Sequence, residues 1–104
     1  TWLPIPPEWA ALTVDKQLND THSTLSFFRQ ALELRRSCAE FDGGAIEWLS
    51  GPADTLIFKR CAGGLICALN AGARRITVPD GEVILASAPV VDGTLPPNAA
   101  AWLV

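Results

Sequence analysis

Few residues in this chain are of the types that carry out chemistry. His22 is the only histidine, and Ser23, Asp20 and Glu8 lie near it in the sequence. A hydrolytic triad needs a nucleophile, a base and an orienting acid in mutual contact. These short spacings at the start of a predicted helix do not imply such contacts. We therefore expect His22 to be an exposed polar residue, and we assign no catalytic residue to the chain.

The cysteines and carboxylates do not form the pattern of a site either. Cys38, Cys61 and Cys67 lack Cys-x-x-Cys spacing, and their odd number argues against a disulfide framework. Most carboxylates stand beside Gly or Pro, where Asp suits turn geometry. No Gly-x-Gly-x-x-Gly stretch or Walker lysine would hold a phosphate. The sequence predicts no metal, no cofactor, and reduced, buried cysteines in a cytoplasmic protein.

The tryptophans divide into two groups. Trp48 and Trp102 lie on predicted strands and are expected in the core. Trp2 and Trp9 lie in a proline-rich segment, and they are candidates for an interface or for the wall of a ligand site. The first 20 residues are predicted to be irregular, because proline disfavours a helix at the residue before it. A short turn of helix in "EWAALTVDKQLN" stays open, with Trp9 and Leu12 on its apolar edge.

The length, net charge and composition of the chain restrict the class of protein. The 104 residues allow one domain at most, and the net charge is −3. The basic residues come as isolated pairs, so we expect no nucleic-acid partner. No apolar run reaches the roughly 18 residues of a membrane helix, so we expect no membrane partner. The chain is 49% hydrophobic and 18% charged and has no Met, which predicts a covered surface and a piece of a longer or processed protein.

A long helix is predicted over residues 20–41, with Asp20 or Ser23 as the N-cap and Gly43-Gly44 as the stop. Its apolar residues span an arc of roughly 200°, wider than the stripe of an ordinary surface helix. Such a helix needs partners on two sides, one of which this chain lacks. Arg35 falls inside the arc. It could extend past its aliphatic stem to the surface, but we favour a buried Arg35 that pairs with a carboxylate or with carbonyls across an interface.

The rest of the chain reads as short strands separated by turn residues. A Gly63-Gly64 hairpin is expected to pair Cys61 with Ile66. One helix followed only by strands predicts an α+β fold with an antiparallel sandwich or curled sheet. The predicted strands are 45–49, 54–61, 65–70, 74–78, 82–87 and 99–104.

The order of motifs resembles the C-terminal part of α-glucosidases of glycoside hydrolase family 13, in the oligo-1,6-glucosidase-like branch. The resemblance is carried by "WLPIPPEW", "LTVDKQLND", "STLSFFRQALELRR", the pair "LIFKR" and "GGLICALN", and "LPPNAAAWLV". It covers essentially the whole chain. The departures are Phe28, where the family often has Tyr, and Thr1, where Pro is common.

The resemblance implies that residues 1–41 are the end of a (β/α)8 barrel and residues 42–104 the antiparallel C-terminal β-domain. These enzymes hydrolyse terminal α-linked glucose by a retaining mechanism with two carboxyl groups. None of those groups maps onto this chain, so it should be inactive alone. Trp2 and Pro4 are the residues nearest the sugar site. The junction with the barrel falls on four residues of the long helix: Leu25, Phe28, Leu32 and Arg35.

Several alternatives remain open from the sequence. The parent could be a trehalose synthase or sucrose isomerase type. The chain could instead be a stand-alone β-sandwich carbohydrate-binding module, which needs exposed coplanar aromatic residues, or an adaptor that binds proteins through its apolar helix. The expected partners are the upstream barrel of the same polypeptide and, through it, α-glucosides. An isolated fragment is expected to leave one helix face exposed or to cover it with a second copy.

Overall fold

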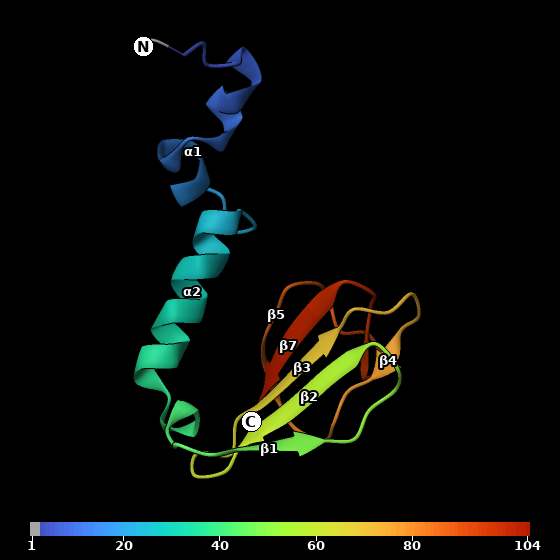
Figure 1. The fold of residues 1–104 in the computed structure, drawn as a ribbon. Helices are drawn as coiled ribbons and strands as arrows, with labels where there is room; N and C mark the ends of the chain where they lie inside the picture. The colour runs from blue at the N-terminus through green and yellow to red at the C-terminus, as the bar shows by residue number, and fades with distance from the viewer. Residues whose placement is uncertain (1–2) are drawn as a thin grey trace. The chain divides into compact units, whose positions relative to one another are not determined.

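The computed structural model describes residues 3–104, and the chain divides into two compact units (Figure 1). The helical unit extends to Arg36, and the β unit is Ser37–Val104. Helices precede strands without alternation, and every strand pair is antiparallel. The fold is therefore α+β, as the sequence predicts.

The helical unit is a series of short helical turns followed by one longer helix, whereas the sequence predicted a mainly irregular segment over the first 20 residues. A 3₁₀ turn, Pro7–Leu12, follows the prolines. Helix α1 is Val14–Leu18, and helix α2 is Thr24–Ser37. Ser23 caps α2, because its Oγ accepts a hydrogen bond from the backbone N–H of Ser26 at 3.2 Å.

Helix α2 is shorter than the sequence predicts. It ends at Ser37, whereas the prediction ran to residue 41 with a stop at Gly43-Gly44. Cys38 has an extended backbone with φ −97° and ψ 123°, and a separate 3₁₀ turn, Ala39–Phe41, follows it. The predicted apolar arc therefore included three residues that lie outside the helix.

The 3₁₀ turn that follows α2 packs against strands of the β unit. The backbone N–H of Leu65 donates to the carbonyl of Glu40 at 3.1 Å. The ring of Phe41 meets Trp102 edge to face, with centroids 4.8 Å apart. These contacts fix the turn against the strands, and continuing the helix would break them.

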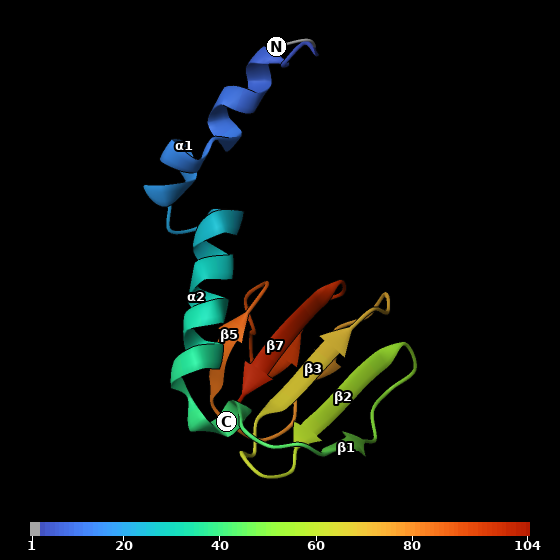
Figure 2. The ribbon, with the colours of Figure 1, turned by 60° about the vertical axis from the view of Figure 1, so that its left-hand side comes forward.

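Five strands form the main sheet, in the order β1-β2-β3-β7-β5 (Figure 2). Two further strands form a separate sheet. The main sheet consists of β1 (Ile46–Leu49), β2 (Thr55–Arg60), β3 (Ile66–Asn70), β5 (Val83–Ala86) and β7 (Ala99–Leu103), and the second of β4 (Ile76–Thr77) and β6 (Thr94–Leu95).

The six predicted strands are all present, and β6 is the strand that the sequence missed. β6 lies in the stretch "DGTLPP", whose Gly and Pro residues are typical of a loop. The predicted hairpin register is also wrong. Ile66 pairs with Lys59, not with Cys61, because the loop after Arg60 contains four residues rather than the shorter turn that was assumed.

The core of the β unit lies on one face of the main sheet. Along β7 buried and half-buried residues alternate, as expected for a strand with one buried face. Small residues, Ala68 and Ala101, pair at the centre of this face. Side chains of the second sheet join the same cluster. Its buried members are Ile57, Ala68, Ile76, Leu95, Ala99, Ala101 and Leu103.

A buried amide connects the two sheets. Asn70 is fully buried at the end of β3. Its Nδ2 donates to the carbonyls of Arg74 at 2.8 Å and Leu95 at 3.2 Å. Its Oδ1 accepts from the backbone N–H of Gly72 at 3.0 Å. The amide is thus fully paired, as a buried polar group must be, and its role is structural.

Candidate functional site

Among residues 3–104, the structure does not assemble a hydrolytic triad around His22. His22 is exposed, and its backbone N–H donates to Asp20 Oδ1 at 2.9 Å. The Ser23 hydroxyl donates to the carbonyl of Gln17 at 2.7 Å while it caps α2. These groups form the start of a helix, which agrees with the exposed polar role that the sequence predicts for His22.

The cysteines are free, but they are not all buried. Cys61 is exposed, which contradicts the prediction of a buried side chain, whereas Cys38 and Cys67 are half-buried. Burial raises the pKa of the Cys67 thiol, and a hydrogen bond with the Trp102 side chain partly offsets this effect. Within residues 3–104, no three His, Cys, Asp or Glu side chains gather where they could hold a metal ion.

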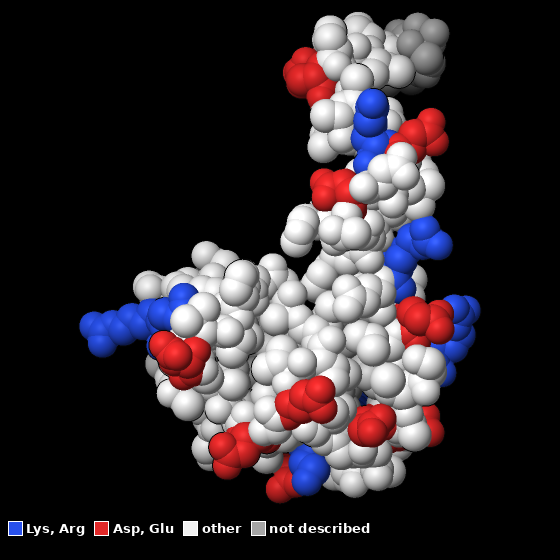
Figure 3. All heavy atoms as spheres, turned by 180° about the vertical axis from the view of Figure 1, so that it is seen from behind, with Lys and Arg blue, Asp and Glu red and all other residues white. Residues whose placement is uncertain are grey.

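The expectation of no nucleic-acid partner and no membrane partner stays a prediction. Figure 3 shows acidic and basic side chains interspersed, with wide neutral areas between them. No helix within residues 3–104 has both the length and the apolar character needed to cross a bilayer.

The predicted junction residues lie on α2 with most of their apolar surface uncovered. Phe28 and Leu32 are each 60% exposed, and they are four residues apart on one side of the helix. Leu25 is half-buried. Arg35 is exposed and takes part in no ion pair with the residues that the structure describes, so its pairing across an interface stays a prediction.

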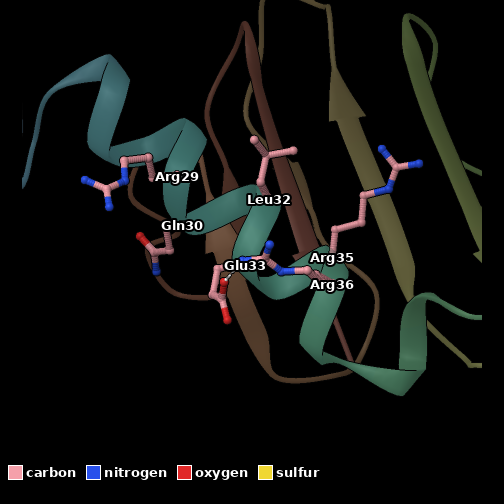
Figure 4. A pocket seen from close by; sticks show the side chains of 6 residues that line it. All are labelled: Arg29, Gln30, Leu32, Glu33, Arg35 and Arg36. Atoms are coloured by element: carbon pink, nitrogen blue, oxygen red, sulfur yellow. Dashed lines mark hydrogen bonds and ion pairs between the residues drawn. The ribbon is translucent and has the colours of Figure 1, made fainter. Parts of the chain in front are cut away.

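A shallow hollow on α2 has no convergent chemistry. Figure 4 shows that its side chains point in different directions around the helix. Arg36 pairs with Glu33 one turn earlier, an exposed pair of the kind that contributes little stability. The six lining residues are Arg29, Gln30, Leu32, Glu33, Arg35 and Arg36.

The residues suggested as nearest a sugar site do not form one here. Pro4 is exposed, and Trp2 lies outside the described residues. A second hollow, which we call the N-terminal hollow, lies close by and is apolar. It is lined by Ile5, Trp9, Ala10, Leu12 and Thr13.

The sheet face opposite the core is largely apolar and partly exposed, and we call it the outer sheet face. The strand register places Trp48, Phe58 and Cys67 in one row, and Trp102 and Leu85 continue it across β7 and β5. A neighbouring row adds Leu56 and Leu69. The outer sheet face thus consists of Trp48, Leu56, Phe58, Cys67, Leu69, Leu85 and Trp102.

The aromatic rings of this face are held edge to face. Trp48 is 62% exposed, and its ring lies 5.7 Å from that of Phe58 at an interplanar angle of 70°. The sequence predicted Trp48 in the core, which is wrong. Trp102 was predicted there too, and it lies half-buried on the same outer sheet face. The strand alternation could have revealed this, because Trp48 precedes a half-buried Leu49 that packs against the core. Such a face suits apolar packing against a partner surface more than flat stacking.

Arg60 is a charged residue on this face, and the sequence did not predict a role for it. It shares a face with Phe58 by the alternation along β2. Its Nη2 donates to the carbonyl of Gly43. Its Nε is buried and has no hydrogen-bond partner within residues 3–104.

No protein-family model matches the chain, and no curated protein matches it in sequence. The candidate site therefore rests on geometry and on the motif resemblance. It consists of two partly exposed apolar surfaces, one on α2 and the segment before it and one on the sheet.

Proposed function

We propose that the chain is the non-catalytic C-terminal part of a glycoside hydrolase family 13 α-glucosidase. The proposal starts from the ordered motifs in the sequence, which span both units. In this interpretation residues 1–41 complete a (β/α)8 barrel and residues 42–104 are the antiparallel β-domain that follows it. The finer assignment of the β unit to an α-amylase-type β-sandwich is part of the same proposal.

The observation that carries the proposal is that the described helical unit buries no apolar side chain. Its two α-helices and its 3₁₀ turn contain no buried residue. A helix that exposes Phe28 and Leu32 gains little from the hydrophobic effect. Such a segment is expected to pack against a larger structure, and the wall of a barrel is one that fits.

The chemistry then belongs to residues upstream of this chain. A retaining α-glucosidase needs one carboxylate as nucleophile and a second carboxyl group as acid and base. The proposed parent supplies these from its barrel, binds α-glucosides there and works in the cytoplasm. The 104-residue chain supports that barrel and is inactive alone.

The test is to express the complete reading frame that contains this chain. We expect the frame to encode an upstream barrel with acidic residues at its strand ends, and the product to release glucose from maltose or isomaltose. The 104-residue chain serves as the control and should release none. Formation of an isomerised disaccharide without free glucose would favour a trehalose synthase or sucrose isomerase. A frame without a barrel overturns the proposal.

A carbohydrate-binding module is the second candidate, because Trp48 is exposed on a sheet face. Sugar stacking uses aromatic rings that lie flat and coplanar. Here Trp48 and Phe58 are 70° apart, and Phe41 and Trp102 are 80° apart. Titration of the chain with maltose and isomaltose, followed by tryptophan fluorescence, separates the candidates. Saturable binding favours the module, and an unchanged spectrum favours the proposal above.

A further inference from the structure

The helical unit has a polar centre in place of an apolar one. Within residues 3–36, Ser23 is the one buried residue, and 9% of its surface is exposed. Its hydroxyl donates to the carbonyl of Gln17 at 2.7 Å. The Ser26 hydroxyl donates to the carbonyl of Asp20 at 2.8 Å. Hydrogen bonds, rather than apolar packing, therefore connect α1 to the start of α2.

The side chain of Gln17, which lies in α1, joins three elements of this unit. Its Nε2 donates at 2.6 Å to the carbonyl of Leu12, the last residue of the 3₁₀ turn. Its Oε1 accepts at 3.0 Å from the backbone N–H of Leu25, in the first turn of α2. Helix ends leave such groups without partners inside the helix. One amide therefore pairs the end of one element and the start of another.

Little besides this amide can orient α1. Gln17 is the one residue of α1 that is not exposed. The apolar residues Val14 and Leu18 are 61% and 47% exposed, so their burial contributes little. A helix of five residues is also far shorter than the roughly 12–15 residues at which an isolated helix becomes marginal in water.

We infer that Gln17 is a joint that fixes α1 against α2 in the free chain. The joint holds the exposed apolar residues of the two helices, such as Leu18 and Phe28, in one arrangement before any partner binds. A surface arranged in advance loses less conformational freedom on binding than a segment that becomes ordered as it binds. The inference does not depend on the identity of the partner, so it holds or fails separately from the proposed α-glucosidase function.

The first test measures residual dipolar couplings of the full chain by NMR. The couplings of α1 and α2 should fit one common alignment. In Gln17→Ala the couplings of α1 should shrink. The Leu25 amide should also exchange with solvent roughly 3–10-fold faster, because it loses a hydrogen bond of ordinary strength.

Gln30→Ala is the matched control, since Gln30 is an exposed glutamine on α2. It should leave the couplings of α1 and the exchange of the Leu25 amide unchanged. Couplings of α1 that are already averaged in the unmodified chain overturn the inference, as do equal changes in Gln17→Ala and Gln30→Ala.

Gln17→Glu separates the two bonds of the joint. At neutral pH its carboxylate keeps an acceptor for the Leu25 N–H but has no donor for the Leu12 carbonyl. The couplings of α1 and the exchange of Leu25 should therefore stay as in the unmodified chain, whereas the couplings of the 3₁₀ turn should shrink. Loss of α1 order in Gln17→Glu overturns the inference. Amide resonances of the β unit should not shift in any variant, and they report that each protein is folded.

Discussion

Asn70 shows how much of this fold depends on one buried side chain. Replacing it by Asp keeps the shape but removes the Nδ2 donor that serves the carbonyls of Arg74 and Leu95. Each buried acceptor left unpaired costs about 1–3 kcal/mol. We therefore expect Asn70→Asp to lower the free energy of unfolding by about 2–4 kcal/mol, measured by urea denaturation followed by circular dichroism.

Asn98→Asp is the matched control for this substitution. Asn98 is exposed and has φ 56°, a left-handed conformation that Asp tolerates almost as well as Asn. Its stability should stay close to that of the unmodified chain. If both variants unfold at the same urea concentration, the amide of Asn70 is not what connects the two sheets.

Cys67 should make stability depend on pH in the alkaline range. Its pKa is raised in the folded chain by burial, whereas an unfolded cysteine titrates near pH 8.5. Above about pH 8.5 the unfolded chain releases a proton that the folded chain retains. The stabilisation is therefore complete below that pH and is lost as pH rises through the folded pKa.

Cys67→Ala should remove that alkaline loss of stability, and Cys61→Ser, at an exposed position, should leave it unchanged. The measurement is the urea midpoint between pH 7 and pH 10. If the urea midpoint of Cys67→Ala falls with rising pH as much as that of the unmodified chain, another residue causes the effect.

Side-chain environments were predicted unevenly from the sequence. The exposed position of His22 is confirmed, whereas Trp48 and Cys61 were predicted in the interior and are exposed. An apolar strand residue can face either side of a sheet, and the choice depends on which side is covered. Asn70 and Arg60 gave no signal, because their partners, such as Leu95 and Gly43, are distant in the sequence.

At the scale of elements, the turn between β2 and β3 needs a glycine. A Cβ atom at Gly63 would lie 2.2 Å from the carbonyl oxygen of Glu40. That oxygen is fixed by its hydrogen bond with Leu65. We expect Gly63→Ala to cost at least about 2 kcal/mol in urea denaturation. Gly44→Ala is the control, since nothing lies within 4 Å of a Cβ there. Equal losses would show that the close approach is not rigid.

Element types could be predicted from the sequence, whereas element ends could not. The apolar alternation of β2 and β7 and the helical period of α2 are local signals, and both held. The end of α2 at Ser37 is set by contacts of Phe41 and Glu40 with residues far along the chain. The pairing of β4 with β6 also joins distant residues, so local patterns could not reveal it.

At the scale of the whole molecule, the two units differ in how they are stabilised. All buried apolar residues of the described chain lie between Ile57 and Leu103. The helical unit has capped helices but no buried apolar side chain. Isolated helices shorter than about 12–15 residues are marginal in water. The β unit should therefore carry nearly all of the cooperative stability.

Residues 37–104 alone should consequently fold. We expect this fragment to unfold in one cooperative transition at nearly the same urea concentration as the full chain, since removal of residues 1–36 takes away no buried apolar contact of the sheet core. Residues 1–36 alone should show no cooperative transition. Circular dichroism and dispersed amide resonances in NMR spectra measure both. An unfolded 37–104 fragment would mean that the β unit needs the helical unit to fold, and that it does not carry nearly all of the cooperative stability.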